Sequence, residues 1–166
     1  MISELKLLIT DTSIWIDLIK RGLLDAFFEL PFSIYAVDFV RDNEVIGVNW
    51  STLAEKGLQL IELSPSEILD LYNLKQAQPC TSLPDIASYV AAIKINGILL
   101  TGDKALRSFA EERLEVHGLL WVIDLFVHYQ ILTPEDASIC LELMLRDPNT
   151  RLPKDECTKR INKWRS

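Results

Sequence analysis

Short apolar segments of strand type alternate with longer segments of helical spacing along most of the chain, and this alternation constrains the fold more than any other feature. The strand-type segments are residues 5–10, 33–37, 58–63, 98–101 and 119–123. Strands that alternate with helices favour βαβ units, in which helices cover both faces of a parallel sheet. The sequence therefore predicts a three-layer α/β/α fold with a central parallel sheet of about five strands.

Helix-start signals separate these strands. Ser64 is followed by proline and, three residues later, by Glu67, which predicts a capping box and a helix to about residue 78. A similar Ser-x-Pro-Asp start at Ser82 predicts a helix that ends at residues 96–97, an Asn-Gly pair. Further helices are expected over 12–20, 104–115, from 134 onward and over 153–164.

The length of 166 residues corresponds to one domain. No apolar run approaches the roughly 20 residues that cross a bilayer, so no membrane segment is expected. The first residues lack the basic stretch of a signal peptide. The three cysteines are odd in number and widely spaced, which favours reduced thiols and a cytoplasmic location.

Charge is distributed unevenly. The net charge of −7 argues against a protein that coats nucleic acid in general. Residues 146–166, however, contain seven basic and three acidic groups, while residues 1–145 carry a net charge of −11. We interpret 1–145 as the main body and 146–166 as a basic helical extension of the same domain. The extension either contacts a polyanion or an acidic partner, or is a helix packed on the body.

Four acids are expected near the carboxyl ends of the predicted strands. Asp11 and Asp103 follow the first and fourth strands, Asp85 begins the helix before the fourth, and Glu44 lies beyond the second. Ligands bind at this edge of an open α/β sheet. Clustered carboxylates favour a hard divalent cation such as Mg²⁺ or Mn²⁺. Each acid alone also has a structural interpretation, as a helix cap or a solvated helix residue.

At these residues the chain resembles the PIN-domain ribonucleases, which include VapC-like toxins. The matching segments are LLITDTS at 7–13, SLPD at 82–85 with the Ala-rich helix after it, and ILLTGDKALR at 98–107. The similarity spans about residues 5–125. It implies a compact parallel sheet with flanking helices, a divalent-metal site of three or four acids, and endonucleolytic cleavage of RNA.

The second acid departs from the family pattern. It is usually a glutamate four or five residues after a small polar residue that ends the second strand, whereas Glu44 lies six residues after Asp38. Glu44 is followed by two apolar residues, as in the family, so we assign it to the site and keep Asp42 as the alternative.

These residues would support hydrolysis of phosphodiester bonds. Asp11, Glu44, Asp85 and Asp103 are the expected catalytic and metal-binding acids, with Asp11 as the candidate bridge between two ions. Ser13 and Thr101 are expected to orient carboxylates. Lys104 and Arg107 are expected to contact substrate phosphates.

The leading hypothesis is a Mg²⁺- or Mn²⁺-dependent endoribonuclease, the toxin of a toxin–antitoxin pair, with RNA as substrate and an antitoxin or a second copy of the chain as partner. The alternatives are an RNA-processing nuclease with the same site and a catalytically silent RNA- or protein-binding module. A receiver-type phosphoacceptor domain would need two adjacent acids early in the chain, and Glu4 is too far from Asp11. His117 and His128 lack the spacing of metal ligands, and the four tryptophans are too scattered to indicate a base-stacking surface.

Overall fold

The computed structural model describes residues 6–43 and 48–166, except for the side chains of 41–43. The strands are β1 (Leu7–Thr10), β2 (Ser33–Val37), β3 (Gln59–Ile61), β4 (Ile98–Leu100) and β5 (Val116–His117). The helices are α1 (Thr12–Lys20), α2 (Leu24–Glu29), α3 (Asp38–Asn43), α4 (Trp50–Lys56), α5 (Pro65–Ala77), α6 (Leu83–Ile95), α7 (Lys104–Ala110), α8 (Leu119–His128), α9 (Pro134–Arg146) and α10 (Lys154–Arg165).

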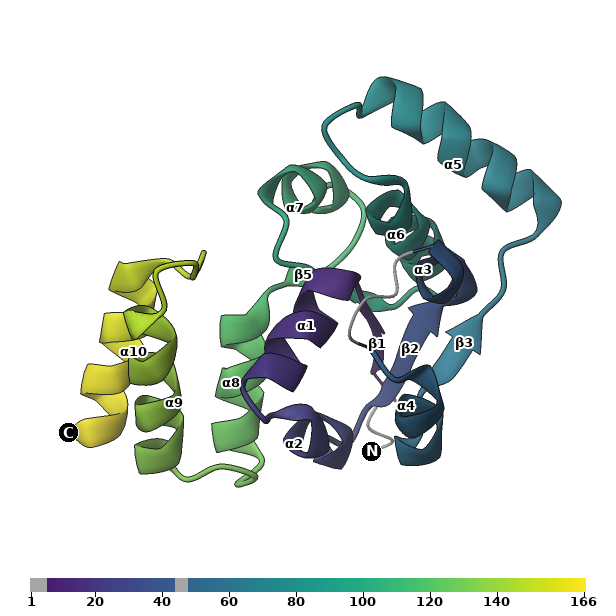
Figure 1. Cartoon of the computed structure of the whole chain (residues 1–166). Helices are drawn as coiled ribbons and strands as arrows, with labels where there is room; N and C mark the ends of the chain where they lie inside the picture. The colour runs from purple at the N-terminus through teal and green to yellow at the C-terminus, as the bar shows by residue number, and fades with distance from the viewer. Residues whose placement is uncertain (1–5, 44–47) are drawn as a thin grey trace, which may run out of the picture.

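The five strands form one sheet in the order β3-β2-β1-β4-β5, and every neighbouring pair is parallel (Figure 1). β1 is the central strand, with Leu8 in register with Ile34 of β2 on one side and Ile98 of β4 on the other. This confirms the parallel sheet and its number of strands. It also places the residue that follows β1, Asp11, at the middle of the sheet.

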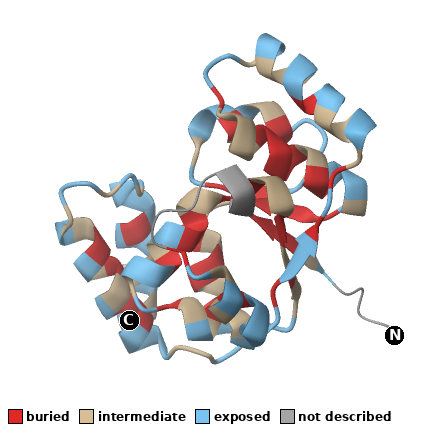
Figure 2. Ribbon diagram, turned by 45° about the vertical axis from the view of Figure 1, so that its right-hand side comes forward, coloured by how far each residue is buried: buried red, intermediate tan, exposed pale blue. Residues whose placement is uncertain are grey.

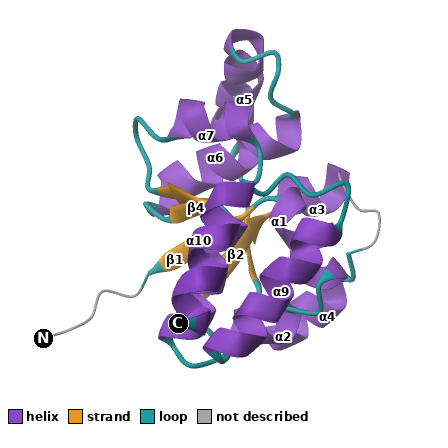
Figure 3. Cartoon of the chain, turned by 90° about the vertical axis from the view of Figure 1, so that its left-hand side faces the viewer, coloured by secondary structure: helices purple, strands orange, loops and turns teal. Residues whose placement is uncertain are grey.

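Alternate residues of the strands face opposite hydrophobic clusters. Leu8 and Leu100 pack with α1, α2, α8, α9 and α10, whereas Ile9 and Leu99 pack with α3, α5, α6 and α7. Buried residues therefore lie on both sides of the sheet, as Figure 2 shows, and helices flank the strands in Figure 3. The three-layer α/β/α architecture is confirmed. Within the described residues, no helix is both long and apolar enough to cross a bilayer.

The helix-start signals are confirmed. The Ser64 hydroxyl accepts from the Glu67 amide at 3.2 Å, and the Glu67 carboxylate accepts from the Ser64 amide at 2.8 Å. The Ser82 hydroxyl accepts from the Asp85 amide at 3.2 Å, and Asn96 ends α6 in a left-handed conformation.

The expected fifth strand at 119–123 is wrong. These residues begin α8, and the strand that pairs with β4 is Val116–His117. The helix expected over 104–115 ends at Ala110, which frees the chain to form that strand. The apolar run belongs to a helix because its buried residues continue with helical spacing through Ile123 to Phe126.

The C-terminal residues form a packed helix rather than a free arm. α10 lies beside α9 (Figure 1), Cys157 is fully buried, and Ile161 and Trp164 pack against the core. The Arg160 guanidinium donates to both oxygens of Asp124 on α8 at 2.9 Å. This agrees with the packed-helix interpretation of residues 146–166.

Candidate active site

Asp11 is fully buried at the point where β1 becomes α1. One carboxylate oxygen accepts from the Ser13 hydroxyl at 2.7 Å and from the Ile14 amide at 3.1 Å, and the other accepts from the Thr101 hydroxyl. The Ile14 bond makes Asp11 the N-cap of α1, so its expected capping role is observed. The hydroxyl contacts agree with the expectation that Ser13 and Thr101 orient a carboxylate.

The buried charge of Asp11 has hydrogen-bond donors and no basic partner in the described structure. Burial raises the pKa of Asp11 from 3.8 to about 6, against the lowering effect of the bonds from Thr101, Ser13 and Ile14. The negative charge of Asp103 raises the pKa further. Burial and the nearby Asp103 both make the negative charge of Asp11 unfavourable. A cation bound beside Asp11 would offset that charge.

Asp103 lies at the same edge of the sheet, after β4. Its amide donates to the Thr101 hydroxyl oxygen at 3.0 Å, and its carboxylate accepts from the Leu106 amide at 3.0 Å, which makes it the N-cap of α7. Thr101 therefore contacts both acids, because the same hydroxyl donates to Asp11. Gly102, between them, donates to Ser13 at 3.2 Å, and a Cβ there would lie 3.2 Å from the Ser13 oxygen.

Of the other two expected acids, the structure describes only Asp85. Asp85 is half-buried in the first turn of α6. Glu44, and the side chain of the alternative Asp42, lie outside the described residues. Among the side chains that the structure describes, no group of three or more His, Cys, Asp or Glu residues is placed to hold a metal ion. Asp11 and Asp103 offer oxygen ligands of the kind that Mg²⁺ and Mn²⁺ prefer, so they fit part of such a site.

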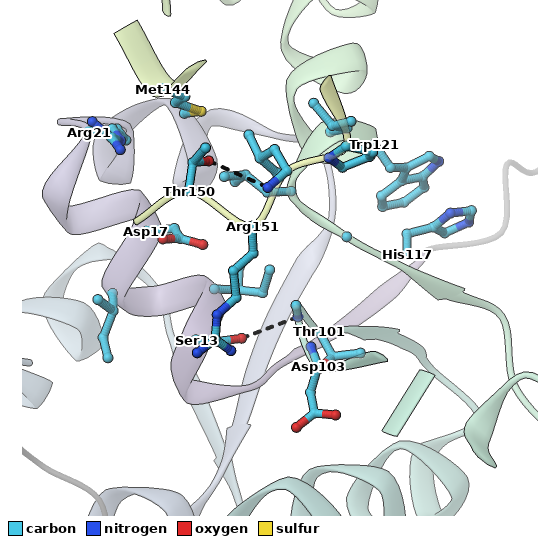
Figure 4. Close-up of a pocket in the computed structure, with 18 of the residues that line it drawn as sticks. Ser13, Asp17, Arg21, Thr101, Asp103, His117, Trp121, Met144, Thr150 and Arg151 are labelled. Atoms are coloured by element: carbon cyan, nitrogen blue, oxygen red, sulfur yellow. Dashed lines mark hydrogen bonds between the residues drawn. The ribbon is translucent and has the colours of Figure 1, made fainter. Parts of the chain in front are cut away.

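A groove of about 670 Å³ runs from this edge of the sheet. Ser13, Thr101 and Asp103 line one part of it, and most of the rest comes from α1, α7, the start of α8, the loop at 147–153 and α10 (Figure 4). The expected phosphate contacts Lys104 and Arg107 also line it. Asp103 therefore shares one cavity with the expected substrate-binding cations, while Asp11 is buried and contacts Ser13 and Thr101, which line that cavity.

Arg107 is placed by a close approach to the backbone. A Cβ at Gly118 would lie 3.1 Å from Nη2 of Arg107, which is tighter than ordinary contacts, so glycine leaves room for the guanidinium. Its nearest acid, Glu111, is 3.8 Å from Nε, and Nε itself has no hydrogen-bond partner among the described residues. The side chain as a whole is 43% exposed and lines the groove, so its terminal nitrogens can reach a ligand there.

The sequence interpretation missed several residues that line the groove. The rings of His117 and Trp121 stack in parallel, with centroids 4.1 Å apart and an interplanar angle of 5°. Arg151 points into the groove from the α9–α10 loop. His117 and Trp121 lie four residues apart in the sequence. This spacing indicates an aromatic pair only when β5 and α8 are placed correctly. Nothing in the local sequence predicts Arg151.

Comparison with protein-family models identifies the family of the chain. A family model described as a PIN domain matches residues 7–166, nearly the whole described chain. The chain belongs to the PIN-domain family. This confirms the predicted resemblance and indicates a nuclease-type fold; the VapC-like subgroup is a finer assignment.

Other comparisons are more distant. No curated protein matches this PIN domain. Among solved structures it is similar to PAE2754 from Pyrobaculum aerophilum, with a TM-score of 0.47 and 9% sequence identity, over 73% of this chain and 89% of that chain. The family assignment rests on the family model.

Proposed function

We propose that this PIN domain is a metal-dependent endoribonuclease that hydrolyses RNA phosphodiester bonds. The observation that carries the proposal is Asp11, a fully buried carboxylate beyond the central strand, held by two hydroxyls beside Asp103 and next to a groove with cationic walls. A catalytic acid needs this kind of fixed orientation, and its neighbours Ser13, Thr101 and Asp103 line a substrate-sized cavity.

The residues that would hold a divalent cation are Asp11 and Asp103, completed by Asp85 and Glu44. When bound, a divalent cation lowers the pKa of a coordinated water and offsets negative charge on the phosphate. The chain itself fixes the carboxylates: Ser13 and Thr101 donate to Asp11, so its oxygens cannot rotate freely.

The groove suits a single-stranded polyanion. Lys104 and Arg107 supply positive charge beside Asp103, and the exposed part of the His117–Trp121 pair offers an aromatic surface against which a base can stack. RNA recognised in single-stranded regions presents both phosphates and unstacked bases. We therefore propose RNA as the substrate class.

Cleavage of a labelled single-stranded RNA tests the proposal. We expect activity with Mg²⁺ or Mn²⁺, none after chelation, and a loss of at least about 100-fold in Asp11→Asn, since asparagine keeps the shape of the side chain without its charge. Asp70→Asn, which removes an exposed carboxylate from α5, is the matched control and should leave activity unchanged.

Circular dichroism of each variant separates loss of chemistry from loss of fold. Full activity in excess EDTA, or in a folded Asp11→Asn protein, would overturn the proposal. RNA binding without any cleavage would favour the catalytically silent binding module.

We further propose that the protein is a cytoplasmic toxin. Its partners would be an antitoxin and a second copy of the chain. The three free cysteines support the location, because thiols persist in a reducing compartment. A short neighbouring reading frame that encodes a DNA-binding partner would support the toxin role, and its absence would favour an RNA-processing nuclease.

A further inference from the structure

The basic groups of residues 146–166 are not equally available to a ligand. Arg160 is paired with Asp124 and Glu156, Lys159 with Glu156, and Arg165 with Glu135 and Glu142. Arg151 forms no ion pair with any residue that the structure describes, and it is exposed. Of the two arginines from this segment that line the groove, Arg151 and Arg160, only Arg151 has a free guanidinium.

The loop that carries Arg151 is anchored. Asp147, at the end of α9, accepts from Lys20 at 2.7 Å and from Arg21 at 2.6 Å, so it ties the loop to the end of α1. Its other oxygen accepts from the Asn149 amide at 2.9 Å. The Leu152 amide donates to the Thr150 hydroxyl at 3.4 Å, and the Leu152 side chain packs against the core. Arg151 therefore extends from a loop that is fixed on both sides.

The Arg151 side chain points toward the candidate active site. Its side chain points from the loop down the groove toward the end that Ser13 and Asp103 line (Figure 4). Burial raises the pKa of Asp17 on α1, and nearby positive charges, one of them Arg151, oppose the rise. The guanidinium thus lies over α1 in the groove, within electrostatic range of the helix that begins at Asp11.

We propose that Arg151 is a phosphate-binding residue of the RNA groove, supplied by the anchored α9–α10 loop to the cavity that Lys104 and Arg107 also line. The inference rests on the proposed function and adds a subsite to it. A guanidinium is planar and binds two phosphate oxygens at once, which suits a strand held in a groove lined by several cations. The preformed loop limits the entropy lost when the contact forms.

The experiment measures binding of a fluorescent single-stranded RNA to Asp11→Asn protein, in which cleavage is blocked, over a series of salt concentrations. Arg151→Gln should weaken binding about tenfold, as expected for one lost charge-assisted contact. It should also reduce the log–log salt slope by about 0.7, the value for one phosphate contact on a single strand. Arg151→Lys should restore the slope and only part of the affinity, since lysine keeps the charge without the fork.

Lys163→Gln is the matched control. It removes one exposed charge of the same sign from α10, outside the groove, and should leave affinity within about twofold and the slope unchanged. In the active enzyme, Arg151→Gln should raise KM about tenfold with little change in kcat, because the contact forms in both the ground state and the transition state.

Two failures are distinguishable. If the wild-type enzyme cleaves RNA and Arg151→Gln matches Lys163→Gln in slope, affinity and KM, the assignment of Arg151 is wrong and the proposed function stands. If Arg151→Gln lowers the melting temperature without changing KM, Arg151 is a structural counter-charge, and the assignment is again wrong. If the wild-type protein neither binds nor cleaves RNA, the proposed function fails and the subsite fails with it.

Discussion

Thr101 connects the two acids that the fold brings together. Its hydroxyl donates to Asp11, and its oxygen accepts from the Asp103 amide at 3.0 Å. The residue is almost fully buried, so water cannot replace either bond. A single side chain therefore links the two acids that follow β1 and β4 at the edge where the site forms.

We expect Thr101→Val to destabilise the protein by about 1–3 kcal/mol, because an isosteric apolar group leaves a buried carboxylate without one donor. Thr101→Ser keeps the hydroxyl and should cost clearly less. Chemical denaturation followed by circular dichroism measures both free energies of unfolding. Equal stability of Thr101→Val and wild type would show that the hydroxyl is dispensable for the fold.

Asp11 and Asp103 also show why residue-scale prediction of this site is incomplete. Both were expected to be either site acids or helix caps, and both are observed as caps. The two roles do not compete, since each cap uses one oxygen to accept from an amide of the helix. The pairing of Asp11 with Thr101 joins residues 90 positions apart, and their proximity followed from the expected parallel sheet.

At the scale of elements, the strands around β1 were predictable because their residues are buried on both faces and carry apolar side chains throughout. The error at 119–123 has a physical cause: a short apolar run fits a buried strand and a buried helix equally well. β5 has only two residues, too few for any pattern to reveal. β5 carries His117 and α8 carries Trp121, and both residues line the groove. Because these two elements were predicted wrongly, the sequence did not reveal the aromatic pair.

The anchored α9–α10 loop predicts a pH dependence. The bond from Lys20, with those from the Asn149 amide and Arg21, lowers the pKa of Asp147 from 3.8 to about 2. A group whose pKa is lower in the folded state stabilises the fold fully above its ordinary pKa and loses that contribution as the pH falls toward 2. We expect the stability difference between wild type and Asp147→Asn to shrink over that interval.

Thermal unfolding of wild type and Asp147→Asn at a series of pH values between about 5 and 2 measures this difference. Asp70→Asn, on the distant helix α5, is the control and should show no comparable convergence. A constant difference across the range would mean that Asp147 does not contribute through its charge.

At the scale of the whole molecule, the basic C-terminal segment neutralises acids of the body instead of standing apart from it. Its arginines reach Asp124 on α8 and Glu135 and Glu142 on α9. The uneven charge distribution was evident in the sequence, but its partners depend on the packing of three helices. The sequence therefore identified the basic segment from its charges. It could not identify which of its basic groups have no acidic partner.

We expect Arg160→Gln to lower stability by about 1–3 kcal/mol, because it removes the two charge-assisted hydrogen bonds to Asp124 and the one to Glu156, and leaves the half-buried Asp124 unpaired. Lys159→Gln breaks only an exposed pair and should cost no more than about 0.5 kcal/mol. The rate of thiol labelling at Cys157, in a protein whose other two cysteines are serine, reports opening of α10. Equal labelling rates in both variants would argue that Arg160 does not hold this helix.

The tie between Asp147 and the end of α1 has a consequence for synthesis. The acids Asp11 and Asp103 leave the ribosome before the α9–α10 loop, so a nascent chain can form the sheet edge while the groove still lacks one wall. Until that loop docks on Lys20 and Arg21, the groove of the proposed nuclease would lack Arg151. Under the proposed function, the order of the elements along the chain would thus delay RNA binding until the α9–α10 loop has docked.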